Sequence, residues 1–314
     1  MSDQPAQHMQ CMEVWSGSQL TDSSVEFGGL DAWVYSKPFG DARRGGDVYY
    51  ASSCATGRIR RLLLADVSGH GSAVADTATR LRTLMRQFVN RLHQAEFVRL
   101  LNRQFVELSQ GGTFATAIVA TFFAPTGRLT VCNAGHPRPV VYRASQRAWS
   151  LLSSGAQSDV RLRNIPLGMI ALAEYEQFDI ELEPGDCLLC YSDALIESCD
   201  AAGEPLREAG LLRIVRGLGD LDAQDITGRL LKEIAARDPT NLSEDDVTVL
   251  IVRANGRAAY YPFGQKLRAL GRFVAALLRA VHPRAERPPL PDANLANIGG
   301  AIIPALSRRW KRQT

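Results

Sequence analysis

Short apolar runs separated by turn residues dominate the chain from about residue 30 to residue 252. Near its start, runs over 31–35, 48–50 and 59–65 alternate or are continuously apolar, which predicts three strands. The same patterns predict further strands over 114–123, 129–133, 140–142, 178–182, 187–191 and 247–252.

Four segments have the helical period instead. Apolar residues recur at helical spacing from Val74 to Leu92, with arginines on the other faces, and a second stripe runs from Phe97 to Leu108. Two more helices are predicted at about 206–217 and 223–236. The order of strands, two helices, many strands, two helices and one strand predicts an α+β fold, with antiparallel sheets and helices packed outside them.

The two ends of the chain differ from this central part. Residues 1–29 are polar with little periodicity, which predicts a flexible N-terminal arm before a domain over 30–254. Residues 255–314 form a basic extension in which 263–281 has one apolar stripe. We expect this amphipathic helix to dock on the domain, to bind a partner or to lie on an anionic membrane surface, and the basic cluster around Trp310 favours the membrane surface.

Composition narrows the functional classes. A chain of 314 residues that is 46% hydrophobic suits one large domain with extensions, and its formal net charge of +3 gives no general case for nucleic-acid binding. The N-terminus lacks a basic-then-apolar signal, and no run reaches the ~18–20 apolar residues that span a bilayer. We therefore expect a cytoplasmic protein, peripheral at the inner membrane surface if the helix 263–281 binds there.

The cysteines do not have metal-binding spacing. Cys187 and Cys190 are three apart in a predicted strand and so point to opposite faces, and no second Cys or Cys/His pair lies near them. Packing in the core is the better interpretation of this pair, and reduced thiols fit a cytosolic protein.

Aspartates stand at the ends of several apolar runs, in tight turns. They are Asp47, Asp66, Asp193 and the pair Asp245-Asp246. Carboxylates at strand ends can converge at one edge of a sheet, where hard oxygen ligands suit Mg²⁺ or Mn²⁺ and support phosphate chemistry. The alternative is that these are ordinary turn aspartates with local hydrogen bonds.

Eight motifs in a fixed order carry a family resemblance. They are Gly-Gly-Asp-Val-Tyr at 45–49, Ala-Asp-Val-Ser-Gly-His-Gly at 65–71, Thr-Phe-Ala-Thr-Ala at 113–117, Asn-Ala-Gly-His-Pro at 133–137, Pro-Leu-Gly at 166–168, Glu-Pro-Gly-Asp at 183–186, Tyr-Ser-Asp-Ala-Leu-Ile-Glu at 191–197 and Asp-Asp-Val-Thr at 245–248. Together they resemble the SpoIIE-type branch of the metal-dependent PPM (protein phosphatase 2C-like) serine/threonine phosphatases, over about residues 30–253.

The resemblance implies a two-layer antiparallel β-sandwich flanked by paired α-helices, with two Mn²⁺ or Mg²⁺ ions at one end. The implied ligands are the carboxylates of Asp47, Asp66, Asp193 and Asp245 and the carbonyl of Val67. Of the final acid pair, Asp245 is preferred to Asp246 because the family's ligand is the first acid of that motif. Ala194 stands where the family usually has glycine, which is tolerable unless the turn needs a positive φ.

The implied activity is hydrolysis of phosphoserine or phosphothreonine by a water that bridges the two ions, without a protein nucleophile. His70 and His136 either protonate the leaving oxygen or brace turns around the site. Arg43 and Arg44 either attract phosphate or are solvated surface charges.

The substrate that the resemblance implies is a phosphorylated anti-sigma-factor antagonist or a similar bacterial signalling protein. One alternative is a catalytically silent phosphatase-like scaffold in a partner-switching pathway, against which the presence of all four acids argues. The other is a phosphoesterase for small molecules or nucleotides, against which the lack of His-rich metal motifs and of a phosphate-cradling glycine loop argues.

Overall fold

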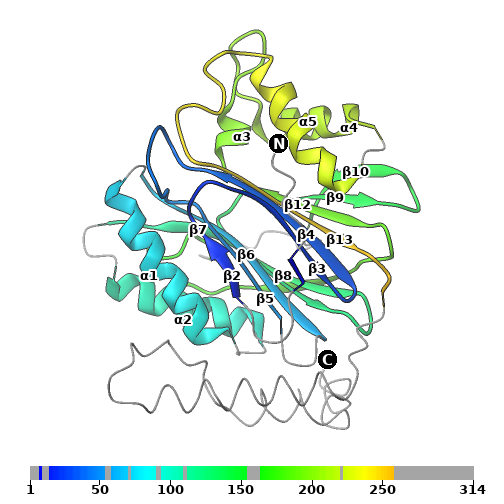
Figure 1. Cartoon of the computed structure of the whole chain (residues 1–314). Coiled ribbons are helices and arrows are strands. Elements are labelled where there is room, and N and C mark those ends of the chain that lie inside the picture. The colour runs from blue at the N-terminus through cyan, green and yellow to red at the C-terminus, as the bar shows by residue number, and fades with distance from the viewer. Residues whose placement is uncertain are drawn as a thin grey trace.

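Two β-sheets lie face to face, and a pair of helices covers the outer face of each (Figure 1). The structure is a computed structural model that describes residues 7–8, 14–53, 58–69, 72–89, 93–108, 112–153, 163–219 and 222–257. The predicted α+β class and the predicted sandwich with paired flanking helices are confirmed.

The described strands form two sheets in which every pair but one is antiparallel. The first sheet contains, in spatial order, β1 (Gln7–His8), β3 (Thr21–Phe27), β4 (Leu30–Lys37), β13 (Val247–Ala254), β12 (Cys187–Tyr191), β9 (Val140–Arg143) and β10 (Ala148–Leu151). The second contains β11 (Gln177–Glu181), β8 (Arg128–Ala134), β7 (Ala115–Phe123), β6 (Ile59–Val67), β5 (Val48–Ser53) and β2 (Val14–Gly17). The exception is the parallel pair of β1 and β3.

The helices pack on the sheets through their apolar stripes. On the second sheet lie α1 (Ser72–Phe88) and α2 (Gln94–Leu108), and on the first sheet lie α4 (Arg207–Gly217) and α5 (Ala223–Ala235). A short helix, α3 (Ala194–Glu197), follows β12 directly. Of the helices in these ranges, none has the length and apolarity that crossing a membrane requires.

Alternation along the strands divides the core into three layers. In β6, Leu62 and Leu64 face the space between the sheets, while Leu63 and Ala65 face α1 and α2. In β12, Cys190 faces the space between the sheets and Cys187 faces the α4–α5 side, and both thiols are free and buried. The interpretation of the Cys187/Cys190 pair as core residues is therefore confirmed.

The prediction of a flexible arm over residues 1–29 is wrong for residues 14–29. Residues 14–17 form β2, and β3 forms a hairpin with β4 across a turn in which Gly29 has φ 92°. Only Val25 and Phe27 of β3 are buried, so its sequence has too few apolar residues to predict a strand. The strand is stabilised mainly by its backbone pairing with β4. The predicted helix over 263–281, with all of 258–314, lies outside the described residues.

Candidate metal centre

The acids singled out from the sequence come together at one end of the sandwich. In the second sheet Asp47 directly precedes β5 and Asp66 is near the end of β6, and the pairing of Val48 with Ala65 places these strand ends side by side. In the first sheet Asp193 follows β12 and Asp245 precedes β13, whose paired ends also adjoin.

A hydrogen bond joins the two sheets at this end. The backbone N–H of Gly46, before β5, donates to Asp246 Oδ2, before β13, over 2.6 Å. The four strand ends therefore meet at a single place between the sheets.

Asp47 is the most unusual residue of this cluster. Its side chain is 2% exposed, and neither carboxylate oxygen has a hydrogen-bond partner among the described residues. Burial raises the pKa of Asp47 well above its ordinary value, as do the nearby charges of Asp66, Asp246 and Asp193. The Thr248 hydroxyl lowers this pKa in part, but it lies outside hydrogen-bond geometry and bonds to Ser36 Oγ over 3.0 Å instead.

Two neighbouring acids have perturbed pKa values for the same reasons. Burial raises the pKa of Asp66 to about 8, with further contributions from Asp193, Asp245, Asp246 and Glu197. Burial also raises the pKa of Asp193 to about 6, helped by Glu197 and Asp245. Carboxylates that raise one another's pKa in a buried place are stabilised by a bound cation, and their oxygens suit Mg²⁺ or Mn²⁺.

The cluster is not a closed cage. Within the described ranges, no group of three His, Cys, Asp or Glu side chains is already arranged around one ion position. Mg²⁺ commonly keeps several waters and takes only one or two carboxylates from the protein. Pairs of these acids completed by water therefore fit the donor set of such an ion.

Asp245 and Asp246 have different surroundings although they are adjacent. Asp246 is 3% exposed and accepts hydrogen bonds from the backbone N–H groups of Phe39, over 2.7 Å, and Gly46. Asp245 is half-buried, accepts from the Asp246 N–H over 2.7 Å and raises the pKa of both Asp66 and Asp193. The carboxylate of Asp246 thus accepts hydrogen bonds from the backbone, whereas the negative charge of Asp245 repels those of Asp66 and Asp193.

The carbonyl of Val67 lies against the turn that contains Asp47. A Cβ added to Gly46 would stand 2.9 Å from Val67 O, so this approach requires glycine. A Cβ on Gly45 would stand only 2.2 Å from Asp246 Oδ1. These close contacts explain why the two positions before Asp47 are glycines: a side chain at either would collide with Asp246 or with the Val67 carbonyl.

His136 is buried behind the site. Its Nδ1 is 2.8 Å from Thr116 Oγ1, and Asn133 holds its backbone through two hydrogen bonds of 2.8 Å. Burial lowers the pKa of His136 to about 3, although the nearby backbone of Tyr191 acts in the opposite direction. The ring is therefore neutral near pH 7. His70 lies outside the described residues.

Ala194, which stands where the family usually has glycine, begins α3. It is not among the described residues with positive φ, so the turn does not require glycine there. Arg43 and Arg44 are exposed beside the Gly45-Gly46 turn. Glu197, which sequence reasoning missed, contributes to the electrostatics of the cluster, and its position four residues after Asp193 in a helical segment was the available signal.

Comparisons with known proteins agree with the family resemblance of the sequence motifs. The family model for stage II sporulation protein E (SpoIIE) matches residues 57–255. The phosphoserine phosphatase RsbU of Bacillus subtilis is 22% identical over 193 residues, which are 61% of this chain and 55% of RsbU. This chain therefore spans about half the length of that curated relative.

Solved structures share the fold. The RsbU and RsbW domains of Rv1364c from Mycobacterium tuberculosis are 23% identical with a TM-score of 0.60, covering 84% of this chain and 76% of that one. The PP2C phosphatase domain of Bacillus subtilis SpoIIE, with a fragment of its regulatory domain, is 20% identical with a TM-score of 0.55, covering 78% and 64%. RsbX in complex with magnesium is 13% identical with a TM-score of 0.54, covering 74% and 99%. These likenesses confirm the predicted PP2C-like fold.

Proposed function

Because this chain belongs to the stage II sporulation protein E (SpoIIE) family, we propose that it is a metal-dependent phosphoprotein phosphatase that hydrolyses phosphoserine or phosphothreonine. The relative RsbU is a phosphoserine phosphatase, and RsbX, which has the same fold, binds magnesium. Both facts support the proposal for this chain.

The observation that carries the proposal is the buried carboxylate of Asp47. Leaving an ionised group buried without a partner is costly, so such groups pair with a charge or coordinate a metal. Both Asp47 oxygens lack a hydrogen-bond partner, and the charged groups that perturb the Asp47 pKa are other acids. A bound divalent cation would offset this charge and favour the ionised carboxylate.

We assign the cation ligands to both sheets. Asp47, Asp66 and the Val67 carbonyl would hold Mn²⁺ or Mg²⁺ from the second sheet, and Asp193 and Asp245 from the first. When bound, two such ions would supply a water of lowered pKa and would offset charge on the phosphoryl group. Asp246 keeps the two turns together by binding the N–H groups of Phe39 and Gly46.

The residues around the ligands have supporting roles in this proposal. Because the pKa of His136 is about 3, we assign it to bracing the turn after β8, through its hydrogen bonds with Thr116 and Asn133, and not to protonating the leaving oxygen. Arg43 and Arg44 are exposed near the Asp47 turn and are positioned to attract a phosphorylated segment. His70 remains a candidate acid from the sequence.

The proposed substrate is a phosphorylated signalling protein of the anti-sigma-factor-antagonist type. The structure of Rv1364c contains an RsbU domain and an RsbW domain together, which supports a place for this fold in partner switching. The inferred substrate class rests on these relatives.

The test is Mn²⁺-dependent hydrolysis of an aryl phosphate and of a phosphoserine protein by the wild type, Asp66→Asn and Asp225→Asn. We expect Asp66→Asn to lose at least a hundredfold in kcat/KM because the substitution removes one of the proposed carboxylate ligands of the metal ions. Asp225 is exposed on α5, so Asp225→Asn is the matched control and should retain wild-type activity.

Two results would contradict this function. Equal activity of the wild type and Asp66→Asn would remove the acid cluster from the chemistry. Absence of turnover in the wild type with both substrates at saturating Mn²⁺ would favour the catalytically silent scaffold.

A further inference from the structure

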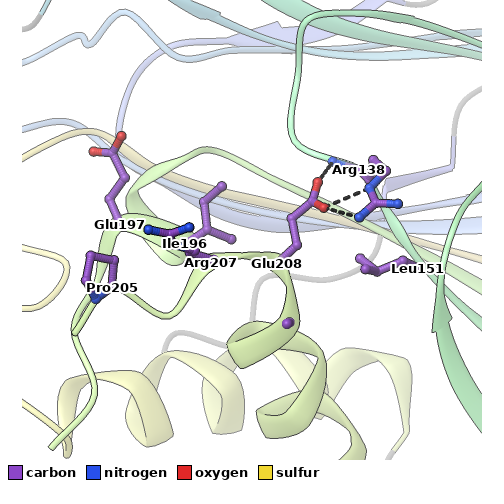
Figure 2. A pocket seen from close by; sticks show the side chains of 8 residues that line it. Arg138, Leu151, Ile196, Glu197, Pro205, Arg207 and Glu208 are labelled. Atoms are coloured by element: carbon purple, nitrogen blue, oxygen red, sulfur yellow. Dashed lines mark hydrogen bonds and ion pairs between the residues drawn. The ribbon is translucent and has the colours of Figure 1, made fainter. Parts of the chain in front are cut away.

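A pocket of about 700 Å³ is lined in part by Glu197, whose charge also acts on Asp66 and Asp193 (Figure 2). Its walls come from the loop before β9, the end of β10, helix α3 and the start of α4. The lining includes Arg138, Leu151, Ile196, Glu197, Arg207 and Glu208. This volume is within the range of about 300–1,000 Å³ that is usual for ligand pockets.

Helix α3 connects the pocket to the proposed metal centre. Asp193 stands directly before this helix and Glu197 ends it, and the Glu197 N–H donates to the Asp193 carbonyl over 2.9 Å. Glu197 also raises the pKa of Asp66 and of Asp193. A phosphorylated segment that reaches the acids therefore has its neighbouring residues within reach of the pocket.

The two arginines of the pocket are in different states. Arg138 is neutralised by Glu208, with Nη2 at 2.5 Å and Nε at 2.7 Å from Oε2 and the Arg138 N–H at 2.8 Å from Oε1. Arg207 is exposed, and its side chain makes no hydrogen bond or ion pair with another described residue. Figure 2 shows the Glu197 carboxylate pointing away from the Arg138–Glu208 pair, so the cation available to a bound molecule is Arg207.

The backbone of Arg207 is strained. Its φ is 52°, in the left-handed region that glycine adopts more readily than any other residue. The Arg207 side chain has no partner among the described residues that would offset this backbone strain. Such outliers gather where a structure positions a group for binding.

We propose that this pocket binds the segment of the substrate phosphoprotein that flanks its phosphorylated residue, and that Arg207 pairs with an acidic side chain of that segment. The partly buried side chains of Leu151 and Ile196 offer an apolar contact beside this charge. The inference rests on the proposed function, and its support is the Arg207 guanidinium, which has no described ion-pair partner, and the continuity with the acids through α3.

The test uses two synthetic phosphoserine peptides of one sequence, with Asp or with Lys at the three positions on each side of phosphoserine. For each variant, kcat/KM for each peptide is divided by kcat/KM for an aryl phosphate, which corrects for changes at the metal centre. We expect the Asp-to-Lys preference to fall about fivefold in Arg207→Ala and at least tenfold in Arg207→Glu. The exposed Arg213 of α4 lies outside the pocket, so Arg213→Ala should keep the wild-type preference.

Arg207→Gly separates binding from folding. Glycine relieves the positive φ, so we expect a higher Tm together with the same loss of preference as in Arg207→Ala. A preference that survives in both Arg207→Gly and Arg207→Glu would overturn the inference while the phosphatase activity stands.

The failure of the proposed function gives a different result. If the wild type hydrolyses none of these substrates, binding of the fluorescently labelled Asp peptide is measured by anisotropy. Weaker binding to Arg207→Glu than to the wild type and Arg213→Ala would still support the pocket, and equal binding to all three would overturn it.

Discussion

Asp47 carries the chemical argument at the scale of single residues. A carboxylate that is 2% exposed with two unpartnered oxygens has no local role in the turn, unlike Asp246, whose oxygens accept two backbone N–H groups. The sequence predicted that these acids lie at strand ends, but not this division of roles. Adjacent aspartates look alike in a sequence, and only the approach of Phe39 and Gly46 distinguishes them.

The stability of the metal-free protein should fall as the pH rises from about 6.5 to about 8. The pKa of Asp66 is raised to about 8 in the folded protein from an ordinary value near 3.8, so between these values the folded state holds a proton that the unfolded state has lost. Stability therefore falls with rising pH until Asp66 of the folded protein ionises near pH 8. The loss is at most about 1.4 kcal/mol per pH unit for one proton. His136, with its pKa lowered to about 3, affects stability only below about pH 6.5.

Urea unfolding in EDTA at pH 6.5 and pH 8 measures this effect. Asp66→Asn should have a flatter dependence than the wild type, while the exposed Asp225→Asn should follow the wild type. Identical pH dependence in all three proteins would show that Asp66 ionises normally.

Asp246→Ala should destabilise the fold more than Asp245→Ala. Removing the Asp246 carboxylate leaves the N–H groups of Phe39 and Gly46 without their acceptor, at a cost of about 2–4 kcal/mol in unfolding free energy. Removing Asp245 takes away one of several repelling charges, so we expect a change below about 1 kcal/mol in EDTA. A larger loss in Asp245→Ala would reverse these assignments.

At the scale of elements, helices and buried strands were predictable and the first strands were not. The stripes of α1, α2, α4 and α5 gave helices close to their observed bounds, because a helix needs many apolar residues on one face. Strand β3 has only Val25 and Phe27 in the core and depends on pairing with β4, which a local pattern does not contain. Its turn glycines, Gly28 and Gly29, were the available hairpin signal.

Phe27→Ala tests whether β3 is part of the folded domain. The Phe27 ring is 2% exposed, with the Arg60 guanidinium 5.6 Å from its centroid, so truncation should cost about 3–5 kcal/mol of unfolding free energy. Phe114→Ala is the matched control, since that ring is 37% exposed, and should cost less than about 1 kcal/mol. No difference between the two variants in urea unfolding would mean that β3 does not contribute to the core.

At the scale of the whole molecule, the proposed centre is shared by two sheets. Asp47 and Asp66 belong to one sheet and Asp193 and Asp245 to the other, and the Gly46–Asp246 hydrogen bond joins them. The ordered motifs predicted the family, which is confirmed, and the two-sheet fold. The pocket at Arg207 was not predictable, because it forms where Arg138 and Leu151 lie against the later segment 196–209.

The most direct test of the central claim is a calorimetric titration of the protein with Mn²⁺. We expect the wild type and Asp225→Asn to bind two ions, and Asp47→Asn to lose at least tenfold in affinity for one of them, because its buried oxygens would no longer carry charge. Equal binding by Asp47→Asn, or no Mn²⁺ binding by the wild type, would contradict a metal centre built on these acids.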